Sequence, residues 1–131
     1  MKKIALLFTS IFFVLGFAKA QDVYFSGNHN GTGMIWKNDS LIYNLSDSLF
    51  VNLQALQIDT NGRIYSAGMV YDSTFENMQG QIWRDDELLF SAESATAIND
   101  LIVNENGWIA AGFGKNEWRN SAGLVWKNGE V

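Results

Sequence analysis

The chain has no cysteine, no proline and only one histidine in 131 residues. Without cysteine it can form neither a disulfide framework nor a lipid-modified cysteine, so packing alone must stabilise the fold. A single histidine excludes a multi-histidine metal site within one chain. Without proline, chain reversals must rely on glycine, asparagine and aspartate.

Catalytic and cofactor motifs are also missing. Gly112-Phe113-Gly114 is too short for a dinucleotide fingerprint, and no phosphate loop is present. Asp59-Thr60-Asn61-Gly62 lacks the spacing and the final Glu of an EF-hand loop. His29 with Ser26 or Ser66 formally allows a Ser-His-Asp triad, but no nucleophile-elbow motif accompanies either serine. We therefore assign no catalytic residue and expect neither a metal ion nor a cofactor.

Positive charge is scarce outside the first twenty residues. Lys2 and Lys3 precede an apolar run over 4–17, and Ala18-Lys19-Ala20 fits a signal-peptidase site. We therefore expect a signal peptide over 1–20, cleaved before Gln21, and an exported protein of the periplasm or extracellular space. A membrane anchor is the weaker interpretation, since a spanning helix needs roughly 18–20 apolar residues.

Removal of that segment makes the chain strongly acidic. Three of its nine basic residues lie in the segment, which leaves six against fourteen acidic residues, a net charge of −8. Nucleic acids and anionic membranes attract positive surfaces, so we expect neither as a partner. The acidic excess also keeps an exported protein soluble without any role in recognition.

One phrase occurs three times. Ile-Trp-Lys-Asn-Asp-Ser-Leu at 35–41 returns in similar form, without a gap, at 82–88 and 125–131. Three glycines, Gly27, Gly68 and Gly112, mark a second repeated position, 41 and 44 residues apart. Such a period indicates stacked supersecondary units. We predict a signal peptide and one domain over 21–131, with repeats at about 22–62, 63–107 and, incomplete, 108–131.

Each period is expected to hold four short strands, because β-branched and aromatic runs alternate with glycine and asparagine rather than following a helical spacing. The expected strands lie at 23–27, 33–36, 41–43, 53–59, 64–68, 80–83, 88–90, 98–104, 109–112 and 123–126. Apolar residues on both faces of 34–36 and 101–103 require cover on both sides, as in face-to-face stacking. Asn61-Gly62 and Asn106-Gly107 indicate type I′ hairpins.

At these residues the chain resembles exported bacterial β-propeller-like proteins, whose repeat reads approximately Val-Tyr-Val-Ala-Gly, a variable loop and then Trp-Lys-Asn-Gly. The resemblance covers nearly all of 21–131. It implies an all-β fold of propeller-type four-stranded blades, with about two and a half repeats in an incomplete, open propeller, because closure takes four to eight blades. The missing blades would come from a longer protein, which we favour, or from other copies of the chain.

The three equivalent tryptophans, Trp36, Trp83 and Trp126, are expected to pack between blades rather than bind sugars, since a packing role predicts one in every repeat. Recognition is expected instead where the repeats differ, in the loops between the first and second strands, which all emerge on one face. The candidate ligand-binding residues in these loops are His29, Asn30, Tyr71, Asp72, Phe75, Glu76, Trp118 and Arg119. Aromatic residues there could also fold back over the sheet ends.

Three functions remain open. The first is a non-enzymatic binding or scaffold module that recognises an extracellular protein or glycan through these loops. The second is a fragment of an extracytoplasmic enzyme, a glycan hydrolase or lyase, because propellers host such enzymes as well as lectins and scaffolds. The third is a purely structural repeat. The lone histidine and the absence of cysteine favour the first.

Overall fold

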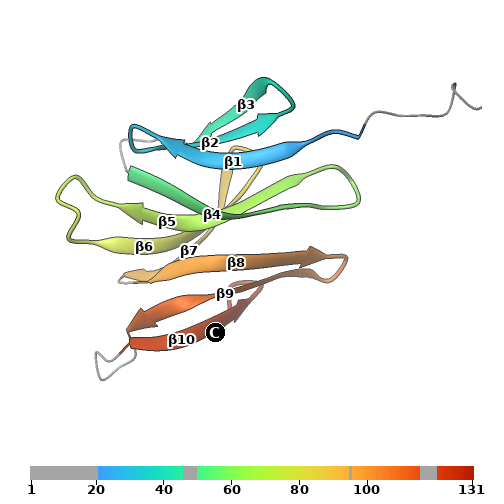
Figure 1. Ribbon diagram of the computed structural model, residues 1–131. Helices are drawn as coiled ribbons and strands as arrows, with labels where there is room; N and C mark the ends of the chain where they lie inside the picture. Colours follow the sequence, from blue (N-terminus) through green and yellow to red (C-terminus); the bar gives the residue numbers. More distant parts are fainter. Residues whose placement is uncertain (1–20, 46–49, 95, 116–120) are drawn as a thin grey trace, which may run out of the picture.

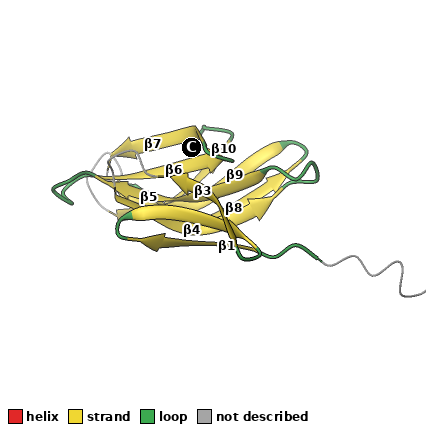
Figure 2. Cartoon of the chain, turned by 90° about the horizontal axis from the view of Figure 1, so that it is seen from above, coloured by secondary structure: helices red, strands yellow, loops and turns green. Residues whose placement is uncertain are grey.

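The computed structural model describes residues 21–45, 50–94, 96–115 and 121–131, and it contains ten β-strands and no helix in these ranges (Figures 1 and 2). The expected all-β class is thus confirmed, and each of the ten expected strands overlaps an observed one. No helix in the described ranges is long and apolar enough to cross a membrane. The expected signal peptide lies outside them.

The strands form three antiparallel sheets, which we number along the chain. Sheet 1 contains β1 (Tyr24–His29), β2 (Thr32–Lys37) and β3 (Ser40–Leu45) in the order β1-β2-β3. Sheet 2 contains β4 (Phe50–Ile58), β5 (Ile64–Tyr71), β6 (Met78–Arg84) and β7 (Glu87–Ser94) in the order β4-β5-β6-β7. Sheet 3 contains β8 (Ala97–Asn104), β9 (Gly107–Lys115) and β10 (Ser121–Lys127) in the order β8-β9-β10.

The sheets are offset by one strand from the sequence repeats. β4 and β8, which the repeat places last in its first two units, pair with β5 and β9 and so begin sheets 2 and 3. Among the described strands, β1, β5 and β9 are therefore equivalent, as are β2, β6 and β10. In the described ranges, sheet 2 has all four strands, whereas sheet 1 shows no counterpart of β4 and sheet 3 none of β7.

In each copy of the repeated tryptophan motif, a turn residue lies directly after the strand, which is β2, β6 or β10. These residues, Asn38, Asp85 and Asn128, all have positive φ, 53°, 58° and 52°, a conformation that Asn and Asp tolerate.

Each turn residue bonds the chain just before or at the start of the neighbouring strand. The Asp85 carboxylate accepts the backbone N–H of Ile64 at 3.0 Å, while its own N–H donates to the Ile64 carbonyl at 2.6 Å. Equivalent pairs of bonds join Asn38 to Val23 and Asn128 to Trp108. We call this contact the turn clamp. It makes the phrase part of the scaffold.

The type I′ prediction is wrong for both turns for which it was made. Gly62 and Gly107 have positive φ, 80° and 116°, but Asn61 and Asn106 do not, whereas a type I′ turn requires positive φ at both central residues. Side-chain bonds account for the difference. In the first turn, for example, Asp59 Oδ1 accepts the N–H groups of Asn61 and Arg63, at 2.8 and 2.9 Å.

The three sheets stack face to face (Figure 1). β4 packs against β1 and β2, and β8 packs against β4, β5 and β6. One apolar cluster, centred on Ile35, Leu53 and Trp83, fills the space between sheets 1 and 2, and a second, centred on Ile82 and Trp126, fills that between sheets 2 and 3. Trp83 and Trp126 are buried and so have the expected packing role. Trp36 is half-buried and stacks on Phe25 at 5.1 Å.

Close stacking depends on glycine at the start of the second strand of a sheet. An added Cβ at Gly33 would come within 2.7 Å of the Val51 side chain, and one at Gly80 within 2.9 Å of the Ile98 side chain. Any larger residue there would push the next sheet away. At the equivalent Gly123 the space is open, with no atom within 4 Å.

The outward faces of sheets 1 and 3 carry apolar side chains. Val125 of β10 is 58% exposed, whereas its equivalents Ile35 and Ile82 are fully buried beneath the next sheet. On the other side of the stack, Val23 is 61% exposed while its equivalent Ile64 is buried. The described strands close no barrel, so the stack is open at both faces.

Candidate functional site

The predicted loops emerge together at one end of the stack. Residues 30–31 between β1 and β2 and residues 72–77 between β5 and β6 lie on the left in Figure 1, as do the end of β9 and the start of β10. The start of β4 lies at the same end. We call this end the loop end. The turns before β5 and β9 lie at the opposite end, which we call the turn end.

Asp72 organises the longer loop at the loop end. Its carboxylate accepts the Thr74 hydroxyl at 2.7 Å and the Thr74 N–H at 3.0 Å, and it also accepts the side-chain amide of Asn77. Its backbone N–H donates to the Asn77 carbonyl at 3.2 Å. Bonds from the Thr74 hydroxyl and the Asn77 amide lower the pKa of Asp72 from 3.8 to about 2. The carboxylate is therefore ionised at every physiological pH.

The same loop presents Phe75 to solvent. Phe75 has positive φ, 59°, and is 59% exposed. Its N–H donates to the Asp72 carbonyl at 3.1 Å, so the loop holds this conformation. The ring packs against Phe50, with 4.4 Å between centroids, and lies 6.0 Å from Tyr71. Phe50, Tyr71 and Phe75 thus form one cluster, which we call the aromatic cluster.

The short turn after β1 joins this cluster. Asn30 and Gly31 both have positive φ, 51° and 81°, so this pair, unlike Asn61-Gly62 and Asn106-Gly107, has the φ signs of a type I′ turn. The Phe50 ring lies where a Cβ on Gly31 would be, which fixes glycine at that position. The Gly31 carbonyl accepts the Val51 N–H at 2.8 Å. Asn30 and His29 are exposed, with their side chains 3.2 Å apart.

The structure thus brings Tyr71, Asp72 and Phe75 into one loop, and places His29 and Asn30 in the neighbouring turn. Glu76 is exposed, and its backbone N–H donates to the Thr74 hydroxyl at 3.4 Å. Trp118 and Arg119 lie outside the described residues. The predicted folding back of the aromatic residues is partial, because Phe75 contacts Phe50 and stays largely exposed.

Sequence reasoning missed Phe50, the residue that joins the two loops. The strand predicted at 53–59 begins three residues earlier in the structure, so Phe50 belongs to β4 and reaches the loop end. A signal was available: Phe50-Val51 continues the apolar run of that strand toward its start.

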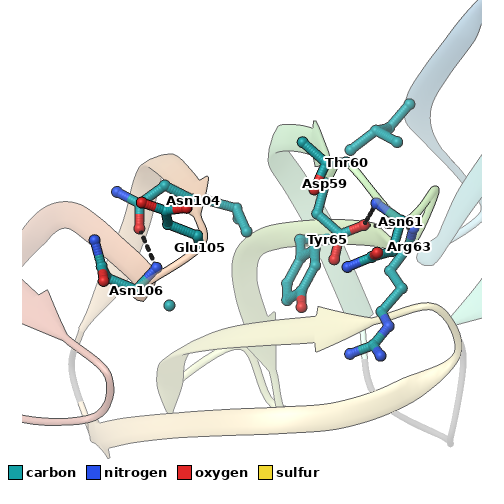
Figure 3. A pocket seen from close by; sticks show the side chains of 11 residues that line it. Asp59, Thr60, Asn61, Arg63, Tyr65, Asn104, Glu105 and Asn106 are labelled. Carbon is teal, nitrogen blue, oxygen red and sulfur yellow. Dashed lines mark hydrogen bonds between the residues drawn. The ribbon is translucent and has the colours of Figure 1, made fainter.

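A groove of about 710 Å³ lies at the turn end, between the β4–β5 and β8–β9 turns (Figure 3). Asp59, Asn61 and Arg63 line one side, and Asn104, Glu105 and Asn106 line the other. Sequence reasoning treated these residues only as turns. The side-chain oxygens of Asp59 and Asn104 already accept hydrogen bonds from backbone N–H groups of their own turns. The groove is thus a wide polar gap, and two of its side-chain acceptors already hold the turns that line it.

Within the described ranges, no cluster of three or more His, Asp or Glu side chains could hold a metal ion. Comparison of the chain with family models, with curated proteins and with solved structures found no match.

Proposed function

We propose that the protein is an exported binding module of β-propeller type, without enzymatic activity, that recognises an extracellular protein or glycan at the loop end. The single observation that carries this proposal is Phe75, a large aromatic side chain that is mostly exposed on a residue with positive φ. Positive φ in a phenylalanine costs free energy, and exposing its ring to water is an additional cost. Both features together favour a recognition role.

The surroundings of Phe75 suit recognition. Asp72 orders the loop before any ligand arrives, which lowers the entropy lost on binding. The aromatic cluster offers a flat apolar surface, while His29, Asn30 and Glu76 beside it offer exposed polar groups. An aromatic surface rimmed by hydrogen-bonding groups fits both a sugar ring and an aromatic or proline-rich peptide.

The propeller assignment is part of the same proposal. Two features support it. Sheet 2 is a four-stranded antiparallel sheet that is covered on both faces, and the repeat period, in residues, lies in the low-to-mid forties. In a propeller the loops at one end of the blades form a shared surface, which is where the aromatic cluster lies.

A screen of glycans and of extracellular proteins tests the proposal, with wild type compared with Phe75→Ala. Leu88→Ala is the matched control, since Leu88 is similarly exposed, at 55%, but lies at the turn end in β7. We expect the Phe75 variant to lose binding by about tenfold or more and the Leu88 variant to retain it. Retained binding in the Phe75 variant would refute the role of the loop end. Binding of no ligand by wild type would favour a structural repeat.

A further inference from the structure

The outer edge of β1 lacks the strand that its equivalents have. β5 pairs with β4, and β9 pairs with β8, on the side away from the second strand of the sheet. Among the described residues, β1 pairs with β2 alone. Within the part of the chain that the structure describes, sheet 1 therefore presents an open edge at the position that a first strand occupies in sheets 2 and 3.

The two existing first strands pair in the same way. Leu53 of β4 lies opposite Gly68, and Ile98 of β8 lies opposite Gly112. In both sheets a β-bulge follows at once, and the pairing resumes two residues further along the first strand. The position opposite the glycine and the bulge after it therefore define a common register.

The glycines are needed because of that bulge. A Cβ on Gly68 would overlap the Asn52 carbonyl oxygen, and a Cβ on Gly112 would overlap the Ala97 carbonyl oxygen. Gly27 is the equivalent residue of β1, and its φ is not in the left-handed region. A Cβ there would meet only the Trp36 ring, at 3.6 Å, which is ordinary contact. The described chain gives Gly27 no steric reason to be glycine, whereas a bulged strand beside β1 would.

The edge itself is suited to strand addition. β1 contains no charged residue, and its pairing with β2 is free of bulges, although exposed edges are usually protected by such features. Phe25 is 47% exposed, while its equivalents Ser66 and Ala110 are fully buried. Phe25 and Val23 therefore belong to the exposed outward face of sheet 1, and a strand added beside β1 would extend this apolar face.

We propose that β1 accepts an extended segment of a partner protein as an additional antiparallel strand, in the register of β4 and β8. The segment has an apolar residue opposite Gly27, a bulge, and a second apolar residue three positions on, as Leu53 and Leu56 do in β4. A second copy of the chain is the poorer donor, because its strands of this pattern, β4 and β8, are already paired in their own sheets. This surface is separate from the loop end.

A labelled synthetic peptide with the sequence of residues 96–104 serves as the probe, since it carries the apolar pair Ile98 and Leu101 and the bulge between them. Its affinity for the purified protein, made from the full sequence, is measured by fluorescence anisotropy. A peptide of the same composition in shuffled order is the reference. We expect the native order to bind and the shuffled order to bind at least about tenfold more weakly.

Two protein variants locate the peptide. Gly27→Ala is expected to weaken binding by about tenfold or more, since its methyl group would overlap the backbone of the added strand. Gly123→Ala is the matched control, because its position is equally open. Phe25→Lys provides a second block at the edge by charge. The unfolding transition of each variant shows that it is folded.

The proposal is overturned if the native and shuffled peptides bind alike, or if neither binds. It is also overturned if Gly27→Ala and Phe25→Lys bind as wild type does, or if Gly123→Ala alone loses binding, which would place the peptide on sheet 3. Sedimentation of the protein without peptide tests the donor. A dimer that Gly27→Ala dissociates would replace the partner protein with a second copy.

Discussion

Asp72 is the side chain on which the conformation of the loop between β5 and β6 depends most. Its lowered pKa, about 2, comes from the bonds that Thr74 and Asn77 donate to the carboxylate. A group whose pKa is lowered in the folded protein stabilises the structure above its unfolded pKa, and that contribution is lost as the pH falls through the folded value. The loop should therefore stay ordered down to about pH 4 and loosen between about pH 4 and 2.

This prediction is checked by following the carboxyl carbon of Asp72 and the backbone amides of Thr74 and Asn77 by NMR during an acid titration. We expect the two amides to shift together with the carboxyl signal. In Thr74→Ala the pKa should rise toward 3.8, since the first of the two causes is removed. Titration of wild-type Asp72 near 3.8, without a response at the amides, would show that these bonds do not form in solution.

Residue-scale features were only partly predictable from the sequence. The loop position of Tyr71, Asp72 and Phe75 followed from the differences between repeats, but their contacts did not. Phe50 precedes β5 by fourteen residues and reaches Phe75 only because β4 pairs with β5. A contact of that kind depends on strand pairing, which the spacing of apolar residues alone does not give.

The turn clamp is the device that each sheet repeats. In sheet 2 it depends on Asp85, whose carboxylate and backbone N–H both bond Ile64. Asp85→Ala removes the side-chain hydrogen bond and places at this position an alanine, which tolerates positive φ less well than Asp does. We therefore expect a loss of about 2 kcal/mol in the free energy of unfolding. Urea unfolding followed by tryptophan fluorescence measures it.

Asp85→Asn is the matched control for this prediction, since Asn already performs the same role at 38 and 128. It keeps the accepting oxygen and tolerates positive φ, so its free energy of unfolding should stay within about 0.5 kcal/mol of wild type. If the Asn variant is as unstable as the Ala variant, the negative charge rather than the bond geometry stabilises the turn.

The strands themselves were predictable, but their assignment to sheets was not. Glycine, asparagine or aspartate interrupts most of the apolar runs, which together with the repeat was sufficient to find all ten strands. The start of a periodic unit can be placed at any of its four strands, so the repeat does not show which strands share a sheet. The turns at Asn61-Gly62 and Asn106-Gly107 held the missing information, because a tight turn joins β4 to β5 and β8 to β9 as hairpin partners.

For the whole molecule, the sequence predicted stacking from apolar residues on both faces of the strands, and an open array from the number of repeats. Both clusters between the sheets agree with the stacking. The repeat also allows an internal comparison of three equivalent residues, because the next sheet covers two of them and leaves the third uncovered. Ile35 and Ile82 are fully buried, whereas Val125 on the outward face of sheet 3 is 58% exposed.

That comparison predicts different costs for truncation at equivalent positions. Ile82→Ala should lower the free energy of unfolding by about 2–4 kcal/mol, because it leaves a cavity between sheets 2 and 3. Val125→Ala removes side-chain atoms that already contact water, so its cost should be below about 0.5 kcal/mol. Urea unfolding of both variants in dilute solution gives the two values. Equal costs would mean that the outward face of sheet 3 is covered in solution, and raising the protein concentration would then distinguish a second copy from a cover within the same chain, because only the former depends on concentration.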